Sequence, residues 1–212
     1  MSEETPGRVT ISSPRGTRRV RAVSIDEAEV RRTSADVLRI AGIHDGHTWA
    51  ETDVHRMIDE AEPEAAMNRA LRLLGHRERS STELTGRLAE DGYPDHVIDS
   101  VTTRLADYGY LDDSRFAGEY VRSKRASGWG RRRIAKGLSE RGVDPDISSQ
   151  LLDSHLPEDS EIDRACEAIH GLDVCDRKGF AKGLRRLVSR GFSYEVAQAA
   201  LHRQKQDAQD LG

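Results

Sequence analysis

Positively charged side chains are concentrated in one stretch of the sequence, residues 120–136, which contains no acidic residue. Arginine predominates there, and a guanidinium group can pair with two oxygens of a phosphate or a carboxylate at once. We therefore expect this stretch to contact a nucleic-acid backbone or an acidic groove on a protein. The candidate contact residues are Arg122, Lys124, Arg125, Trp129, Arg131, Arg132, Arg133 and Lys136.

Three of these arginines, residues 131–133, fall in the first turn of a predicted helix. A cation in that turn is disfavoured by about 0.3–1 kcal/mol, because the helix N-terminus already carries a partial positive charge. Stability alone would not select arginine here, which favours a functional role. The alternative is an arginine-rich face that is merely solvated. Trp129 lies between two glycines, so its ring either stacks on a partner or anchors the turn between two helices.

No set of residues in the sequence suggests catalysis or metal binding. Asp112 and Asp113 are adjacent carboxylates that diverge in direction on a helix, and no histidine or nucleophile accompanies them. Cys166 and His170 lie four residues apart, but Cys175 falls in a different turn and no fourth ligand is indicated. Phosphate-binding glycine motifs are missing as well. We therefore expect no enzymatic activity, no cofactor and no metal.

The composition predicts small helical modules rather than one large core. Hydrophobic residues make up 36% of the chain and charged residues 33%, which leaves little apolar material for a single globule. Alternating Val, Ile and Thr runs typical of strands are scarce, so the sequence predicts an all-α protein. No apolar run suggests a membrane span or a secretory signal. The two cysteines do not make a disulfide framework, so a cytoplasmic location is expected.

Glycines and capping residues divide the chain into helices from Pro63 onward. Gly75, Gly92 and Gly109 follow runs of apolar residues at helical spacing, and glycine commonly ends a helix in the left-handed conformation. Ser80 is followed three residues later by Glu83, which is the arrangement of a capping box at a helix start. Pro94 suits the start of the next helix because its φ angle is fixed.

This pattern of residues repeats along the chain. Five positions of the first copy have counterparts 50 residues later, and four have counterparts 99 residues later. The first copy is Leu84, Leu88, Gly92, Val97 and Val101; the second is Ile134, Leu138, Gly142, Ile147 and Leu151; the third is Leu187, Gly191, Val196 and Ala200. Such periodicity is typical of stacked helical repeats, in which neighbours complete one another's cores.

The sequence thus predicts an elongated tandem array of three three-helix repeats, at residues 61–110, 111–156 and 157–212. A segment of different composition, residues 1–60, precedes them. It mixes Ser, Thr, Gly, Pro and charges of both signs, with only weakly helical spacing in residues 26–40 and 48–58. We expect this N-terminal extension to be largely flexible and to lack a packed core.

Several segments of the chain resemble the RecX family of regulatory proteins over residues 65–203. The most specific is G-Y-L-D-D-S-R-F-A, which joins the first and second repeats. This string is longer and less common than a general pattern of helical residues would produce. The segments are R-E-R-S-S-T-E-L (77–84), D-Y-G-Y-L-D-D-S-R-F-A (107–117), Y-V-R-S-K-R (120–125), G-W-G-R-R-R-I (128–134) and R-G-F-S-Y-E-V (190–196).

This resemblance implies a function as well as a fold. Proteins of the RecX family are built from three three-helix repeats. They bind the RecA nucleoprotein filament along its groove and limit filament growth, ATP hydrolysis and strand exchange, in DNA repair, homologous recombination and the SOS response. The resemblance therefore implies a non-enzymatic regulator, expected to be a monomer, whose partner is the RecA filament. It carries over no catalytic residue, and it does not extend to residues 1–60.

Two other kinds of function remain open from the residues alone. Three-helix units with a glycine turn also suit direct DNA binding, although their second and third helices contain few of the Asn and Gln residues that read bases. Whether single- or double-stranded DNA is touched within a RecA complex is equally open. A scaffold that docks acidic partners is the other alternative. Effects on RecA, and the salt dependence of binding to naked duplex, would separate these alternatives.

Overall fold

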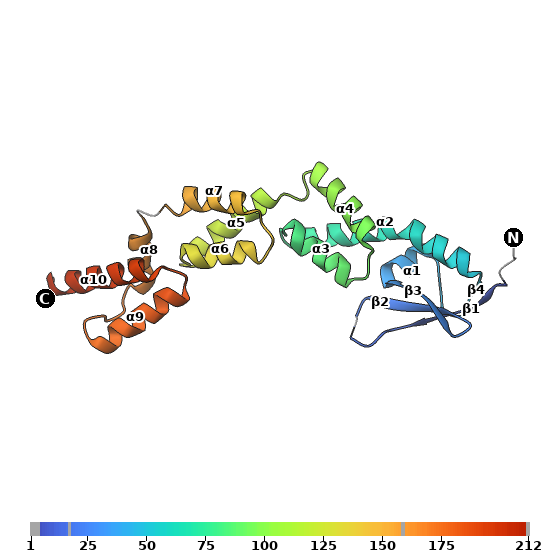
Figure 1. The fold of residues 1–212 in the computed structure, drawn as a ribbon, viewed down its shortest axis with the longest axis horizontal. Helices are drawn as coiled ribbons and strands as arrows, with labels where there is room; N and C mark the ends of the chain where they lie inside the picture. The colour runs from blue at the N-terminus through green and yellow to red at the C-terminus, as the bar shows by residue number, and fades with distance from the viewer. Residues whose placement is uncertain (1–4, 17, 158–159, 211–212) are drawn as a thin grey trace. The chain divides into compact units, whose positions relative to one another are not determined.

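The computed structural model describes residues 5–16, 18–157 and 160–210 (Figure 1). The chain divides after Asp112 into two compact units. The first contains β1 (Gly7–Ser12), β2 (Val20–Ile25), β3 (Ala28–Ser34), α1 (Ala35–Ala41), β4 (Thr48–Trp49), α2 (Glu51–His76), α3 (Ser81–Glu90) and α4 (Asp95–Asp107). The second contains α5 (Asp113–Ala126), α6 (Arg131–Ser139), α7 (Pro145–His155), α8 (Glu161–Ile169), α9 (Arg177–Ser189) and α10 (Tyr194–Asp210).

The first unit begins with a four-stranded antiparallel sheet in the order β3-β2-β1-β4. Val9 pairs with Ile25 and Ile11 with Val23, so one face of β1 and β2 is apolar. Asp26 and Glu27 form the tight turn between β2 and β3, and both have positive φ angles, 46° and 73°. Two consecutive left-handed residues match the right-handed twist of a hairpin. In this hairpin neither of the two left-handed residues is a glycine.

The sheet corrects two expectations for the N-terminal segment. An all-α chain is wrong for residues 7–49, which contain all four strands. The absence of a packed core is also wrong, because Val9, Val23 and Val37 are completely buried in one hydrophobic cluster with residues of α2, α3 and α4. These strands are short, and they bury their apolar side chains against helices that lie far along the sequence. That long-range packing supplies the stability that local propensity does not.

Helix α2 begins earlier than the sequence predicted. It runs from Glu51 to His76 and passes through Pro63, near which the clear helical pattern of the sequence begins. Gly75 lies inside the helix rather than ending it, and Arg77 follows in an extended conformation. Val54 and Ile58, in the first half of α2, are fully buried in the same cluster as the sheet. The N-terminal sheet and the first set of helices therefore share one core.

Polar contacts also join the sheet to these helices. The Arg19 guanidinium lies 3.7 Å from Asp36 and 3.6 Å from Asp91, at the end of α3. Arg69 of α2 pairs with the same Asp91 at 2.6 Å. The Ser34 hydroxyl donates to the Tyr93 hydroxyl oxygen at 3.2 Å, and both residues are buried. These contacts fix the end of β3 against the turn that follows α3.

A carboxyl group is buried between β3 and α2. Glu62 is only 1% exposed; Oε1 lies 3.4 Å from the Arg31 guanidinium, and Oε2 has no hydrogen-bond partner among the described residues. Burial raises the pKa of the Glu62 carboxyl, although the charge of Arg31 opposes the shift. A carboxyl whose pKa is raised by folding binds a proton more tightly in the folded state, so ionising it lowers the free energy of unfolding.

Replacing Glu62 with glutamine is expected to flatten the dependence of stability on pH. In the parent protein, the free energy of unfolding of the first unit falls as the pH rises from the unfolded pKa, about 4.3, through the raised folded value. Glu62→Gln removes this decrease in the free energy of unfolding, because glutamine does not ionise. Urea unfolding from pH 4 to 7, followed by Trp49 fluorescence in a Trp129→Phe background, measures it. Glu60→Gln is the matched control, since Glu60 is exposed and pairs with Arg56. Parallel profiles for parent and Glu62→Gln would contradict the assignment.

The second unit contains two helical triplets, each with its own hydrophobic cluster. Phe116, Ile134 and Leu152 belong to the cluster of α5–α7, and Ile169, Leu187 and Leu201 belong to that of α8–α10. Both α6 and α9 present one apolar stripe to their cluster and cations to the outside. Helical spacing of apolar residues thus produces the burial that the sequence predicted.

The predicted helix ends and caps are largely confirmed. Glycines at four predicted ends have positive φ angles: Gly92, Gly109, Gly142 and Gly191. The Ser80 hydroxyl accepts from the Glu83 amide, Asp144 accepts from the amides of residues 146 and 147, and Ser193 accepts from Val196. The structure is therefore mostly helical with a small sheet. That its triplets form one continuous elongated array, with boundaries at residues 60, 110 and 156, stays a prediction.

Candidate binding surface of the second unit

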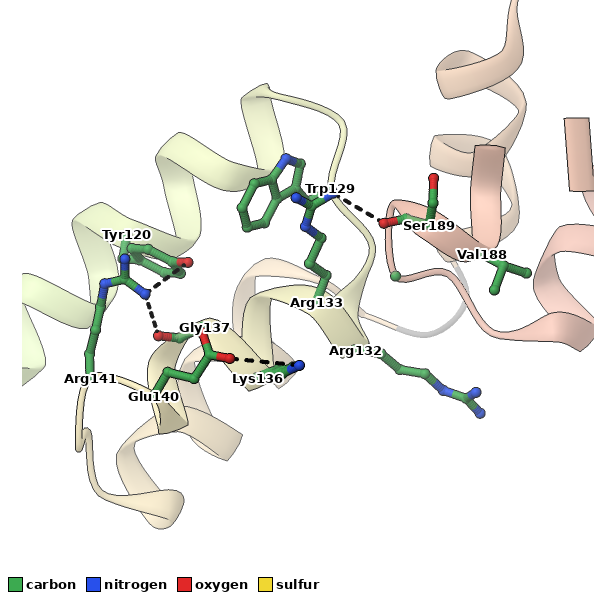
Figure 2. A pocket seen from close by; sticks show the side chains of 11 residues that line it. Tyr120, Trp129, Arg132, Arg133, Lys136, Gly137, Glu140, Arg141, Val188 and Ser189 are labelled. Atoms are coloured by element: carbon green, nitrogen blue, oxygen red, sulfur yellow. Dashed lines mark hydrogen bonds and ion pairs between the residues drawn. The ribbon is translucent and has the colours of Figure 1, made fainter. Parts of the chain in front are cut away.

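A solvent-open pocket of about 540 Å³ lies in the second unit, where α5, α6 and the end of α9 come together (Figure 2). Four cations and a single carboxylate line it, together with two aromatic rings. Its lining residues are Tyr120, Trp129, Arg132, Arg133, Lys136, Gly137, Glu140, Arg141, Val188, Ser189 and Gly191. We call it the Trp129 pocket. Four of the eight candidate contact residues line this pocket.

Cations and rings alternate along one side of this pocket. The Arg133 guanidinium lies 3.9 Å from the centroid of the Trp129 ring, and the Lys124 ammonium lies 4.9 Å from the same centroid. Lys124 also lies 5.3 Å from the centre of the Tyr120 ring, whose other neighbour is Arg141 at 4.7 Å. Each contact is worth about 0.5–1 kcal/mol at an exposed site. The row holds three positive charges close together in a fixed arrangement.

Gly137 makes room for the Tyr120 side chain. A Cβ atom at position 137 would lie 2.1 Å from the Tyr120 hydroxyl oxygen, far closer than two such atoms can approach. The Gly137 carbonyl accepts a hydrogen bond from Arg141 at 2.8 Å, which positions the guanidinium beside the ring (Figure 2). Sequence reasoning missed both Tyr120 and Arg141. The available signal was a glycine inside α6, since a helix-interior glycine costs about 1 kcal/mol unless something packs closely against it.

Main-chain hydrogen bonds join the two triplets beside the pocket. The Gly130 amide donates to the Arg190 carbonyl at 2.8 Å, and the Arg132 amide donates to the Gly191 carbonyl at 3.1 Å. A Cβ atom on Gly130 would lie 2.4–2.5 Å from the main chain of residues 191 and 192. The α5–α6 turn and the α9–α10 turn can approach this closely only because neither carries a side chain at the contact.

Arg131 has a different environment from the other candidates. Its side chain pairs with Asp153, donates to the Leu156 carbonyl at 3.2 Å and is only 23% exposed. It therefore connects α6 to the end of α7. Glu161, which is largely buried, accepts from the Arg131 amide at 3.3 Å. A carboxylate at the N-terminus of α6 offsets the unfavourable run of cations there.

The remaining candidates lie in several settings. Arg132 extends away from α6 and makes no ion pair within the described part of the chain, whereas Lys136 is 77% exposed and lies 3.7 Å from Glu140 (Figure 2). Arg133 donates to the Ser189 carbonyl at 3.1 Å. Arg122 pairs with Glu119 at 2.5 Å and, with Arg125, lines a second pocket instead. The basic residues of the stretch 120–136 are thus divided between two pockets.

Trp129 anchors the turn between α5 and α6, one of the two alternatives considered from the sequence. Its ring is partly buried against the cluster of α5–α7, its amide donates to the Lys124 carbonyl at 3.1 Å, and its carbonyl accepts from Arg164 at 2.5 Å. The ring also lines the pocket. Stacking of the ring on a partner stays a prediction.

The chemistry available in the pocket is recognition of anions. Guanidinium and ammonium groups donate hydrogen bonds to phosphate or carboxylate oxygens. Within residues 5–16, 18–157 and 160–210, no three His, Cys, Asp or Glu residues come together as metal ligands. None of the described helices combines the length and the apolar character needed to cross a bilayer. The second unit thus consists of two helical triplets and presents an open cationic pocket.

Comparison with known proteins identifies the family. Models of two RecX domains match the chain, the first three-helix domain at residues 66–105 and the second at residues 112–152. A regulatory protein RecX of Chromohalobacter salexigens is 37% identical over 138 residues, which cover 62% of this chain and 88% of that protein. One from Mycobacterium avium is 37% identical over 141 residues, covering 63% and 81%. The chain belongs to the RecX family.

Solved structures support the fold. The crystal structure of RecX from Lactobacillus salivarius has a TM-score of 0.60 and 21% identity, and the match covers 68% of this chain and 97% of that one. A second crystal structure of a regulatory protein RecX has a TM-score of 0.59 and 18% identity, with coverage of 92% and 98%. At this coverage the similarity in fold extends well beyond the two matched three-helix domains.

Proposed function

We propose that this protein is a non-enzymatic regulator that binds the RecA nucleoprotein filament and inhibits its assembly, ATP hydrolysis and strand exchange, in recombination and DNA repair. Membership of the RecX family supports the regulatory role. We further propose that it acts as a monomer in the cytoplasm. The contact site is proposed from the Trp129 pocket, which four cations and a single carboxylate line; Arg132, Arg133 and Lys136 are exposed there.

The arrangement of this pocket suits a large anionic partner. Arg132 and Lys136 lie one helical turn apart on α6, and both are exposed. Surface cations of this kind accelerate encounter with a negatively charged partner and fix its orientation. The main-chain bonds between the α5–α6 and α9–α10 turns keep the two sides of the pocket together. A ligand that binds there meets a preformed surface, which lowers the entropy lost on binding.

The experiment is an assay of RecA ATPase and strand exchange on single-stranded DNA with this protein added at increasing ratios. We expect inhibition; inhibition at ratios well below one molecule per RecA subunit would favour blocking of growing filament ends, and inhibition only near one molecule per subunit would favour coating of the filament. Binding to naked duplex is measured in parallel over a range of salt. Tight, sequence-dependent duplex binding near physiological salt, without an effect on RecA, would instead establish a direct DNA-binding module. No effect in either assay would refute both functions.

A further inference from the structure

Helix α9 presents a row of cations that the function proposed above does not use. Between Asp176 and Glu195 the chain contains no acidic residue. One side of the helix is apolar: Leu187 is completely buried in the cluster of α8–α10, and Phe180 and Leu184 pack against that cluster. Five cations of α9 are exposed outside the Trp129 pocket, and we call their surface the α9 face: Arg177, Lys178, Lys182, Arg185 and Arg186.

The cations of the α9 face follow the surface of the helix in order. Lys178, Lys182 and Arg186 are spaced four residues apart, so they lie along one row, and Arg185 lies beside this row. At a rise of about 1.5 Å per residue, the row extends over about 12 Å. Like charges at this spacing destabilise a helix by about 0.2–0.5 kcal/mol per pair. The stability of α9 therefore does not account for them.

Carboxylates do not neutralise the α9 face. None of its five cations makes an ion pair with a carboxylate in the part of the chain that the structure describes. Exposed arginines of other helices have acidic partners one turn away, as Arg56 has in Asp53 and Glu60. The loop before α9 contains Asp173 and Asp176, of which Asp176 caps the helix. With both counted against the five cations, an excess of three positive charges remains.

The helices that pack against α9 do not supply the missing negative charge. Their described carboxylates lie near cations that belong to other elements. The neighbours are Arg203 for Asp163 and Asp207, Arg164 for Glu161 and Glu167, and Arg132 for Glu195. The excess charge of the α9 face is thus left to solvent ions or to an anionic partner.

The chemistry of the α9 face fits the backbone of a nucleic-acid duplex. A duplex carries one negative charge per about 1.7 Å of its axis, so about seven phosphates lie within the length of the row. Protein interfaces usually have an apolar or aromatic centre, and sites for single strands stack bases on aromatic rings. The α9 face has no aromatic ring, because Phe180 packs inward beside His202. A polyanion that is recognised by charge alone matches this surface.

We infer that the α9 face binds the phosphate backbone of a nucleic-acid duplex without reading its sequence. Ammonium and guanidinium groups donate hydrogen bonds to phosphate oxygens, and their binding releases counterions from the duplex. The inference stands apart from the RecA proposal, because it rests on residues outside the Trp129 pocket and its test does not contain RecA. An assay of the RecA ATPase on single-stranded DNA contains no duplex, so the α9 face is not expected to contribute to it.

The test measures binding of the full chain to fluorescently labelled probes by anisotropy over a range of salt concentrations. Two probes are DNA duplexes of twenty base pairs with unrelated sequences. A third is an oligothymidylate of twenty nucleotides, and a fourth is a polyglutamate peptide of twenty residues. The two duplexes test whether sequence is read, whereas the other probes distinguish a duplex site from a single-strand site and from a site for an acidic protein.

Two double variants each remove two charges from the α9 face. They are Lys178→Gln, Lys182→Gln and Arg185→Gln, Arg186→Gln. Glutamine at these exposed positions relieves repulsion between like charges, so both variants should fold. The matched control is Arg39→Gln, Arg104→Gln, which removes two exposed cations from the first unit that make no ion pair among the described residues.

We expect the parent protein to bind both duplexes with affinities that agree within twofold. Each double variant of the α9 face should weaken binding about tenfold and bring the slope of log K against log salt concentration about 2 closer to zero, since each phosphate contact contributes about −0.9. The control should leave the affinity within about twofold. Absence of duplex binding at low salt would overturn the inference, as would equal losses in the control and the α9 variants.

The remaining outcomes identify other partners. A preference of more than tenfold for one duplex would overturn the inference in favour of base recognition. Tighter binding of the oligothymidylate than of the duplexes, dependent on the α9 cations, would overturn it in favour of a single-strand site. Tighter binding of polyglutamate with the same dependence would overturn it in favour of an acidic protein partner.

Discussion

Reversing the charges of Arg132 and Lys136 is expected to raise the concentration of this protein needed for half-inhibition of the RecA ATPase by about 10- to 100-fold. Placing like charges against an anionic partner costs several kcal/mol at an interface, and each 1.4 kcal/mol corresponds to a factor of ten. The double variant Arg132→Glu, Lys136→Glu should still fold. Glutamate at position 132 falls in the first turn of α6, where a negative charge is favourable, and the Lys136–Glu140 pair that is lost is weak and exposed.

The matched control is the double variant Lys178→Glu, Lys182→Glu. These residues occupy the second and sixth positions of α9, as Arg132 and Lys136 do in α6, and both are exposed. The change in net charge is the same, but neither residue lines the Trp129 pocket. We expect half-inhibition to stay within about threefold of the parent value, because exposed charges outside the contact surface act only through screened long-range attraction. Equal losses in the two double variants would show that only overall charge matters and would reject the pocket as the contact site.

Replacing Gly191 with alanine is expected to lower the free energy of unfolding of the second unit by about 2–5 kcal/mol. Gly191 has a φ angle of +89°, and an added Cβ would lie 2.3–2.9 Å from Cβ, N and Cα of Arg133. A left-handed conformation costs a residue other than glycine about 1–2 kcal/mol, and overpacking against backbone adds about 1–3 kcal/mol. Urea unfolding followed by Trp129 fluorescence, in a Trp49→Phe background, measures the change.

Gly171 provides the control for backbone strain alone. Its φ angle is +75°, but an added Cβ would have no neighbour within 4 Å. Gly171→Ala should therefore cost only the conformational part, about 1–2 kcal/mol. The difference between the two variants isolates the close approach of the α9–α10 turn to α6. Equal costs would mean that this approach contributes nothing to stability.

The helices of both units were predictable because their signals are local. Ser80, Asp144 and Ser193 accept hydrogen bonds from amides two or three residues ahead, so a short window of sequence contains cap and helix together. The glycines that follow the helices act over similarly short ranges. Repetition of these signals made the triplets recognisable even though the apolar content is low.

The sheet was not predictable by the same reasoning. β4 has only two residues, and the β2–β3 turn uses Asp26 and Glu27 where glycine or asparagine would have signalled a hairpin. The apolar residues of β1 and β2 pack in one cluster with α1 and with the more distant helices α2, α3 and α4. This packing of the strands against the helices is visible only in the three-dimensional structure. The early start of α2 was hidden for a similar reason, since tertiary packing holds the helix together through Pro63, a residue that usually interrupts a helix.

The candidate site was predictable in composition but not in geometry. A run of arginines reveals a cationic region, yet nothing local distinguishes Arg131, which connects α6 to α7, from Arg132, which faces solvent. Tyr120 and Arg141 join the Trp129 pocket only because α5 and α6 lie against each other. The division of the basic stretch 120–136 between two pockets likewise depends on where α8 lies relative to α5.

Helix α2 packs both against the sheet and against the other helices of the first unit. Its first half covers the apolar face of the sheet together with α1 (Figure 1), and the cluster that begins there continues through α3 and α4. A shortened chain beginning at residue 66, where the first matched domain starts, would lack Val54 and Ile58 and would therefore expose the residues of α2, α3 and α4 in the same cluster. Uncovered apolar surface of that kind drives self-association. The domain boundary suggested by sequence similarity is thus a poor place to cut this protein.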